Sequence, residues 1–166
     1  KRALDGTQGA GVKHLRELLA DANTNLGQER PKEAYDFASV IPQQIEADED
    51  ALGRAATALE EARRTVTQSD GLDTSEMETR LEQATEALAS GNASQAIGLA
   101  DGVVRTVERE RAAMDDVLRA LKQKKKLIKR FENRDDREDW AARMQAIVKA
   151  ADDRVWSHAG MLLEQM

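Results

Sequence analysis

Cysteine is absent from this sequence of 166 residues, and only 3% of the residues are aromatic. Without cysteine the chain has no disulfide, no thiolate metal ligand and no cysteine nucleophile, and its compartment stays open between the cytoplasm and the cell surface. No apolar run approaches the roughly 18–20 residues of a membrane-spanning helix. The two prolines leave little to interrupt long helices. These absences exclude a disulfide-stabilised fold and a membrane span within the sequence.

Charged residues are plentiful, at 34% of the chain, and the formal net charge is −6. Alanine, leucine, glutamate, arginine and glutamine dominate the remainder, which is the composition of long helices and coiled coils. The sequence therefore predicts an all-α fold.

Apolar positions coincide when the sequence is shifted against itself by about 62 residues, an interval that we call the period. The shift places one apolar series on another: Leu15, Leu19, Ala22 and Leu26 fall on Met77, Leu81, Ala84 and Leu88. A further shift, longer by one position, starts a third copy with Trp140, Met144, Ile147 and Ala151. We therefore expect tandem helical units, each one period long.

Each unit combines a short and a long predicted helix. The short helices are expected near 12–27, 75–90 and 137–151, and the long ones near 32–68 and 93–132. Apolar residues follow one another at intervals of three and four, which predicts helix-on-helix packing along a continuous seam. Turn signals such as Gly91-Asn92, and Pro31 in a first helical turn, support these boundaries.

Two acidic residues, Asp48 and Glu110, lie one period apart where the seam calls for an apolar side chain. A buried unpaired acid is costly. We interpret these positions as the points where a long helix passes from one core to the next. The predicted domains are then a partial first unit (1–50), a second three-helix unit (51–110) and a truncated third unit (111–166). The competing layout is a stack of antiparallel coiled-coil hairpins.

This connectivity resembles the spectrin-like tandem array of three-helix repeats, in which the last helix of one repeat runs on as the first helix of the next. The resemblance covers nearly the whole chain, but only as topology, because the unit is much shorter than a spectrin repeat. It implies an elongated spacer made of linked three-helix bundles. It carries over no functional residues.

Motifs for chemistry are missing. The sequence has no glycine-rich phosphate loop and no HExxH motif, and its two histidines, His14 and His158, lack the spacing of metal ligands. We therefore expect no catalytic residue, no cofactor and no metal site, and predict that the chain is not an enzyme. Trp140, in the place of Met77, is expected in the core, whereas Trp156 is less constrained and is a candidate surface anchor.

The stretch LKQKKKLIKRF at 121–131 concentrates positive charge in an otherwise acidic chain. On a continuous helix, Leu121, Ile128 and Phe131 lie on the inner face and Lys124 falls on the seam. The candidate residues for binding an anionic partner are Lys122, Lys125, Lys126, Lys129 and Arg130. Alternatively, they are only cations at the end of a long helix, where the helix dipole favours them, with the acidic segment ENRDDRED folded back to screen them.

Three functional hypotheses follow. The first is a non-enzymatic spacer or scaffold segment of a larger protein, acting through protein partners or self-association. The second is a binding module that uses the stripe at 122–130 for an acidic protein, nucleic acid or lipid headgroups, with nucleic acid disfavoured by the net charge and the few aromatics. The third is a regulatory arm of an enzyme whose catalytic domain lies outside this sequence.

Overall fold

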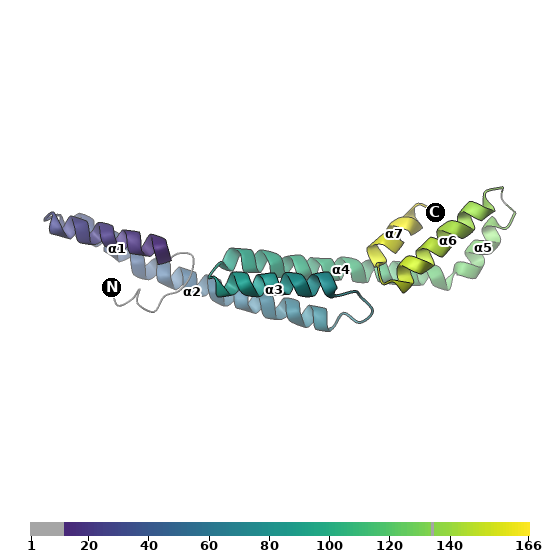
Figure 1. Ribbon diagram of the computed structural model, residues 1–166, viewed down its shortest axis with the longest axis horizontal. Coiled ribbons are helices and arrows are strands. Elements are labelled where there is room, and N and C mark those ends of the chain that lie inside the picture. The colour runs from purple at the N-terminus through teal and green to yellow at the C-terminus, as the bar shows by residue number, and fades with distance from the viewer. Residues whose placement is uncertain (1–11, 134) are drawn as a thin grey trace. The chain divides into compact units, whose positions relative to one another are not determined.

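A computed structural model describes residues 12–133 and 135–166, apart from the side chains at positions 127 and 131. These residues form seven helices and no strand, which confirms the predicted all-α class. The helices, labelled in Figure 1, are α1 (Val12–Gly27), α2 (Pro31–Thr67), α3 (Ser75–Ala89), α4 (Ala93–Lys122), α5 (Lys124–Phe131), α6 (Arg137–Asp152) and α7 (Trp156–Glu164).

The predicted continuous helix over 93–132 is wrong at one point, because the chain breaks between α4 and α5. Gln123, with φ −94° and ψ 2°, separates the two helices. Around Gln123 the backbone hydrogen bonds join residues three positions apart instead of four. The N–H of Gln123 donates to the carbonyl of Ala120 (2.9 Å), and the N–H of Lys126 donates to the carbonyl of Gln123 (2.8 Å). Like charges four residues apart, such as Lys122 and Lys126, disfavour an unbroken helix here.

Helix boundaries recur at the interval found in the sequence. The helices α2, α4 and α7 begin at Pro31, Ala93 and Trp156, so that successive starts lie one period apart, with one extra position at the second step. The preceding helices end with the same spacing, at Gly27, Ala89 and Asp152.

The three turns between these helices share one backbone geometry. A residue with positive φ follows each short helix: Glu29 (58°), Gly91 (75°) and Arg154 (60°). In each turn the next residue donates its N–H to a carbonyl five positions earlier, from Arg30 to Asn25 (2.9 Å), Asn92 to Ala87 (2.8 Å) and Val155 to Ala150 (2.9 Å). This is the Schellman turn that ends many helices. Only one of the three positions is glycine, so the fold imposes the left-handed conformation on the other two.

The chain divides into two compact units, each described here by itself. The first unit comprises Lys1–Arg63 with Thr79–Asp101, and the second comprises Arg64–Glu78 with Gly102–Met166. Helices α2, α3 and α4 each contribute residues to both. The three predicted units, with boundaries near residues 50 and 110, stay a prediction.

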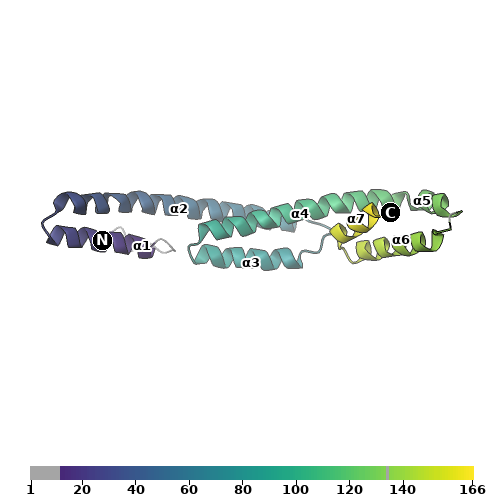
Figure 2. The ribbon, with the colours of Figure 1, turned by 90° about the horizontal axis from the view of Figure 1, so that it is seen from above.

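Two clusters of buried side chains lie in the described part of the first unit. Leu15 of α1 and Ile41 of α2 are buried together where α1 runs beside α2 (Figure 1). Further along α2, Ala55 clusters with Ala87 of α3 and Ala96 of α4. Figure 2 shows these three helices side by side. Alanine at all three positions lets the helix backbones approach closely, as the predicted helix-on-helix packing requires.

In the second unit α7 folds back on α6, and α5 lies beside α6. Trp156 at the start of α7 is only 7% exposed. Its indole N–H donates to the carbonyl of Gly71 at 2.9 Å, in the segment between α2 and α3. The hypothesis of a surface anchor at Trp156 is therefore wrong, because the side chain is buried and the Gly71 carbonyl accepts its indole N–H.

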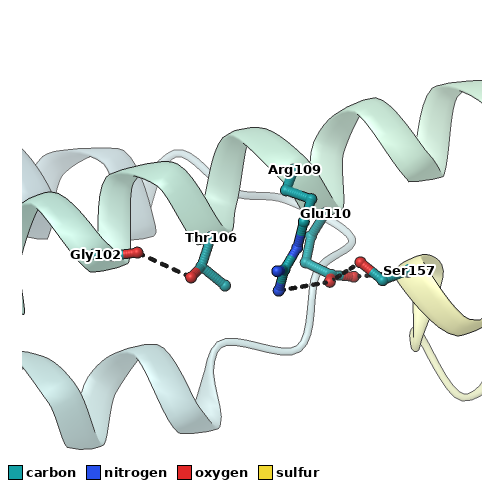
Figure 3. Close-up of polar contacts among 5 residues, drawn as sticks. All are labelled: Gly102, Thr106, Arg109, Glu110 and Ser157. Atoms are coloured by element: carbon teal, nitrogen blue, oxygen red, sulfur yellow. Dashed lines mark hydrogen bonds and ion pairs between the residues drawn. The ribbon is translucent and has the colours of Figure 1, made fainter.

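The two acids that interrupt the seam have different partners. Asp48 accepts a hydrogen bond from the side-chain amide of Gln44 one turn away in α2, at 3.0 Å. Glu110 of α4 instead accepts both the backbone N–H (3.0 Å) and the hydroxyl of Ser157 in α7 (Figure 3). Arg109 adds an ion pair at 3.8 Å. Glu110 thus satisfies donors in the first turn of another helix, which is the role of an N-cap residue.

Candidate functional site

A groove with a volume of about 430 Å³ lies between α5 and α6 in the second unit. Its apolar lining consists of Ile128, Trp140, Ala141, Met144 and Met166, and its polar lining of Lys124, Glu132, Arg137, Glu138 and Gln145. We call it the α5–α6 groove. Met144 is buried at 5% exposure, so it forms part of the floor.

Ile128 lies on the inner face, as predicted, but half of its surface (50%) is exposed. It lines the groove, which no described helix fills. Leu121, one turn before the break, is half-buried. The side chain of Phe131, the third residue expected on this face, lies outside the described part of the structure. The inner face of α5 is therefore open at Ile128.

Trp140 was expected in the core, and the structure corrects this as well. The ring is half-buried and lines the groove. Its indole N–H donates to the carboxylate of Asp136 at 3.0 Å, and the guanidinium carbon of Arg143 lies 5.9 Å from the ring centroid. These contacts hold the ring in place with part of it open to solvent, an arrangement typical of tryptophans at interfaces.

The five cations predicted to bind an anionic partner are all exposed. We call them the basic stripe: Lys122, Lys125, Lys126, Lys129 and Arg130. Within residues 12–133 and 135–166, no hydrogen bond or ion pair ties their side chains to another residue. Among the described residues between Glu132 and Asp139, no acidic side chain forms an ion pair with them, and the interpretation that this segment screens them stays a prediction.

The break at Gln123 also changes the electrostatic argument for the stripe. Lys125 and Lys126 now lie in the first turn of α5, where the helix dipole disfavours positive charge. That turn contains no acidic residue. Only Lys129 and Arg130, in the last turn, occupy positions that the dipole favours. The dipole thus explains part of the stripe and leaves Lys125 and Lys126 without a structural reason.

Lys124 connects the stripe to the groove. It is half-buried and lines the groove, which agrees with its predicted place on the seam. The residue one period earlier, Ala62, is completely buried. A lysine in such a place keeps its ammonium hydrated, so the core opens here. This inward lysine was the one signal in the sequence for the groove, which sequence reasoning otherwise missed.

Other polar candidates do not converge. His14 is 69% exposed and its Nδ1 lies 4.0 Å from a carboxylate oxygen of Glu17, and His158 is exposed. In the described ranges no three histidine, aspartate or glutamate side chains are placed to hold a metal ion together. The described helices also include none with the length and apolarity to cross a bilayer.

Asn92, in the sequence Asn92-Ala93-Ser94, has a structural role. Its side-chain oxygen accepts the backbone N–H of Gln95 at 3.2 Å, and its amide donates to the Gln95 side chain at 2.9 Å. These bonds cap the first turn of α4.

In comparisons with known protein families, curated proteins and solved structures, the chain matches none of them.

Proposed function

We propose that the chain is a non-enzymatic spacer or scaffold segment, built from tandem helical units of about 62 residues, that engages protein partners through exposed helix faces. The observation that carries this proposal is the spacing of the helix boundaries. Helices begin at Pro31, Ala93 and Trp156, and the apolar pattern of the sequence repeats with the same period, including the one extra position at the second step.

The turns support the same proposal independently of the apolar pattern. Glu29 and Arg154 adopt a left-handed conformation that costs an L-residue about 1–2 kcal/mol. Both lie at the position that glycine occupies at Gly91. A recurring strained position is expected when one structural unit is repeated with different side chains.

The distribution of α4 between the two units fits the spectrin-like connectivity. This helix supplies Ala96 to a core cluster of the first unit and Glu110 to the second unit. A helix shared by neighbouring cores is the linking element that a tandem spacer needs.

Deleting one period tests the repeat. Removing 41–102 takes out one whole period and joins Val40 to Val103, so the apolar seam continues in register. Removing only 41–100 leaves two more residues, which rotate the rest of the helix by about 200°. We expect cooperative unfolding, followed by circular dichroism, only for the whole-period deletion. Equal loss of cooperativity in both variants would contradict the repeat.

Small-angle scattering tests the spacer. A compact domain of this length has a radius of gyration of about 16 Å. The proposal predicts a clearly larger value, and a value near that of a compact domain would contradict an extended spacer.

A second candidate function is a binding module for an anionic partner, and one observation favours it. The cations of the basic stripe lack ion-pair partners among the described residues, and Lys125 and Lys126 lie where the α5 dipole opposes them. Replacing Lys125, Lys126 and Lys129 with glutamate is expected to abolish binding to an anionic partner without loss of helicity.

A further inference from the structure

The break between α4 and α5 lies at Gln123, inside the run of positive charge at 121–131. We infer that this break is a charge-controlled joint. Repulsion of Lys122 by Lys125 and Lys126 keeps α4 and α5 as two helices, and a soluble multivalent anion that neutralises this charge joins them into one. The inference adds a conformational control to the proposed spacer, and its ligand part rests on the second candidate function, the binding of an anionic partner.

The same position one period earlier lies inside an unbroken helix. Helix α2 continues through Glu61, which occupies the place of Gln123, to its end at Thr67. Glutamate and glutamine have similar helix propensities, so the residue at this position does not explain why one helix is broken and the other is not. The cause therefore lies among the neighbouring side chains.

The charge pairs across this position have opposite signs in the two copies. In α2, Glu60 is followed three and four residues later by arginines, at 63 and 64. Side chains at these spacings are neighbours on a helix, and an acid that precedes its cation is the more favourable order. In the next copy, Lys122 is followed at the same spacings by Lys125 and Lys126. Two attractive pairs in the unbroken helix thus correspond to two repulsive pairs at the break.

The helix dipole and the backbone hydrogen bonds favour one continuous helix. At the break, the N–H groups of Gln123 and Lys126 bond to carbonyls three positions earlier, a geometry poorer than that of the α-helix. The break also places Lys125 and Lys126 in the first turn of α5, where the dipole opposes them, whereas in a joined helix they lie toward the C-terminal end, where it favours them. Charge repulsion thus opposes other forces, and a modest change in charge shifts the balance.

Lys124 provides a competing explanation of the break. It occupies the place of Ala62, which is completely buried, so a continuous helix turns its ammonium toward the core, where a charge is costly. If this cost causes the break, Lys124→Ala joins the helices. If repulsion across Gln123 causes it, Lys124→Ala has little effect and a change at Lys122 joins them.

The decisive variant is Lys122→Glu, because it places an acid ahead of the two lysines, as in α2. Joining is followed by NMR, through the α-carbon shift of Gln123 and the contact between its amide hydrogen and the α-hydrogen of Arg119, which lie together in an α-helical turn. The ratio of joined to broken forms is expected to rise about fivefold or more. The control is Arg105→Glu, the same change of charge at an exposed position of α4, and it should leave the Gln123 signals unchanged.

Salt distinguishes repulsion from an uncharged cause. The Debye length falls from about 10 Å at 0.1 M salt to about 3 Å at 1 M. Sodium chloride is therefore expected to increase the joined fraction of the native chain. In Lys122→Glu the pairs attract, so the same salt should decrease it.

Inorganic triphosphate tests the ligand part. A multivalent anion neutralises several neighbouring cations at once and displaces their monovalent counterions. Triphosphate is therefore expected to join the helices of the native chain beyond the effect of sodium chloride at the same ionic strength. It should lose this effect in Lys122→Glu and keep it in Arg105→Glu. Circular dichroism and the signals of α6 and α7 confirm that each variant retains its fold.

Each result decides between the alternatives. If Lys122→Glu leaves Gln123 unchanged, or if salt has no effect on the native chain, the joint is overturned. If Lys124→Ala joins the helices as fully as Lys122→Glu, the inward lysine causes the break and the inference also fails. If Lys122→Glu joins the helices but triphosphate shifts none of the lysine signals, the joint stands, and the ligand part fails because the anion does not bind. If triphosphate binds without joining the helices, anion binding stands and the ligand part alone fails.

Discussion

The carboxylate of Glu110 in α4 accepts the backbone N–H of Ser157 in α7 at 3.0 Å and the hydroxyl of the same residue. Val155, the N-cap of α7, makes no side-chain capping bond of its own. The Glu110 side chain is 15% exposed. One helix thus caps another across 47 residues of sequence, and the acid that interrupts the apolar seam has a structural partner.

Replacing Glu110 with alanine is therefore expected to destabilise α7 and the contact between α7 and α4. The loss of an N-cap costs about 0.5–2 kcal/mol, and the charge of the acceptor puts Glu110 toward the upper end. Glu110→Gln, which keeps an acceptor without the charge, should cost less. Urea unfolding measures both, with the exposed Glu108→Ala in the same helix as the control. Equal stability of the Glu110→Ala and Glu108→Ala variants would falsify the capping role.

Glycine substitution at the left-handed turns should stabilise the protein. Glu29 and Arg154 have φ values of 58° and 60°, which glycine adopts without steric cost. The gain is expected to be about 0.5–1 kcal/mol at each site, because relief of the strain exceeds the added entropy of the unfolded chain. Thermal unfolding of the two single variants checks the sign of the effect.

Two glycine-to-alanine changes provide the matched comparison. Gly53 lies inside α2, and a Cβ there meets no atom within 4 Å. Gly53→Ala should therefore raise the free energy of unfolding by about 0.5–1 kcal/mol. Gly91→Ala, at φ 75°, should instead cost about 1 kcal/mol or more. The same sign for both changes would contradict the conformation assigned to Gly91.

The two tryptophans should report opposite environments. Trp156 is buried against the carbonyl of Gly71, whereas Trp140 lies half-buried in the groove. A protein retaining only Trp156, through Trp140→Phe, should show blue-shifted emission and weak quenching by acrylamide. The Trp156→Phe protein should show the reverse and should also lose about 1 kcal/mol of stability with the hydrogen bond. Equal quenching of the two proteins would disprove this assignment.

Asp73 should make the start of α3 sensitive to acid. The hydroxyl and backbone N–H of Ser75 donate to its carboxylate at 2.6 and 3.0 Å. These bonds, aided by the charge of Arg154, hold the pKa of Asp73 below its ordinary value of 3.8. Because the folded pKa is lowered, the stabilisation is present above pH 3.8 and is lost as the pH falls through the folded pKa.

The size of this effect is small, because the Asp73 carboxylate is exposed and solvent screens it. NMR titration of the carboxyl carbon measures the pKa directly. The Ser75 amide signal should follow the same titration, and Asp73→Asn should remove it. A Ser75 amide that titrates unchanged in Asp73→Asn would assign the effect to another group.

The sequence was enough to predict the basic stripe, but it was not enough to predict the α5–α6 groove. Lys122, Lys125, Lys126, Lys129 and Arg130 follow from counting charges along a helix, and all five are exposed. The groove depends on which helices cover Ile128 and Trp140, and no local pattern contains that information. The break at Gln123 was predictable only in part. The run of like charges is visible in the sequence, but the sequence analysis expected a continuous helix there.

The sequence by itself determined the helical class, the ends of the short helices and the inner face of most of the chain. These features follow from local chemistry: Pro31 starts a helix, Gly91 ends one and Asn92 caps the next, all through bonds spanning at most five residues. Tertiary structure alone decided that Trp156 is buried, that Trp140 lines a groove and that Glu110 caps α7. The hydrogen bond of Trp156 to Gly71 joins residues 85 positions apart, and that of Ser157 to Glu110 joins residues 47 positions apart. Such pairs form only once the helices have packed, because no periodicity along one helix specifies which distant backbone group a side chain meets.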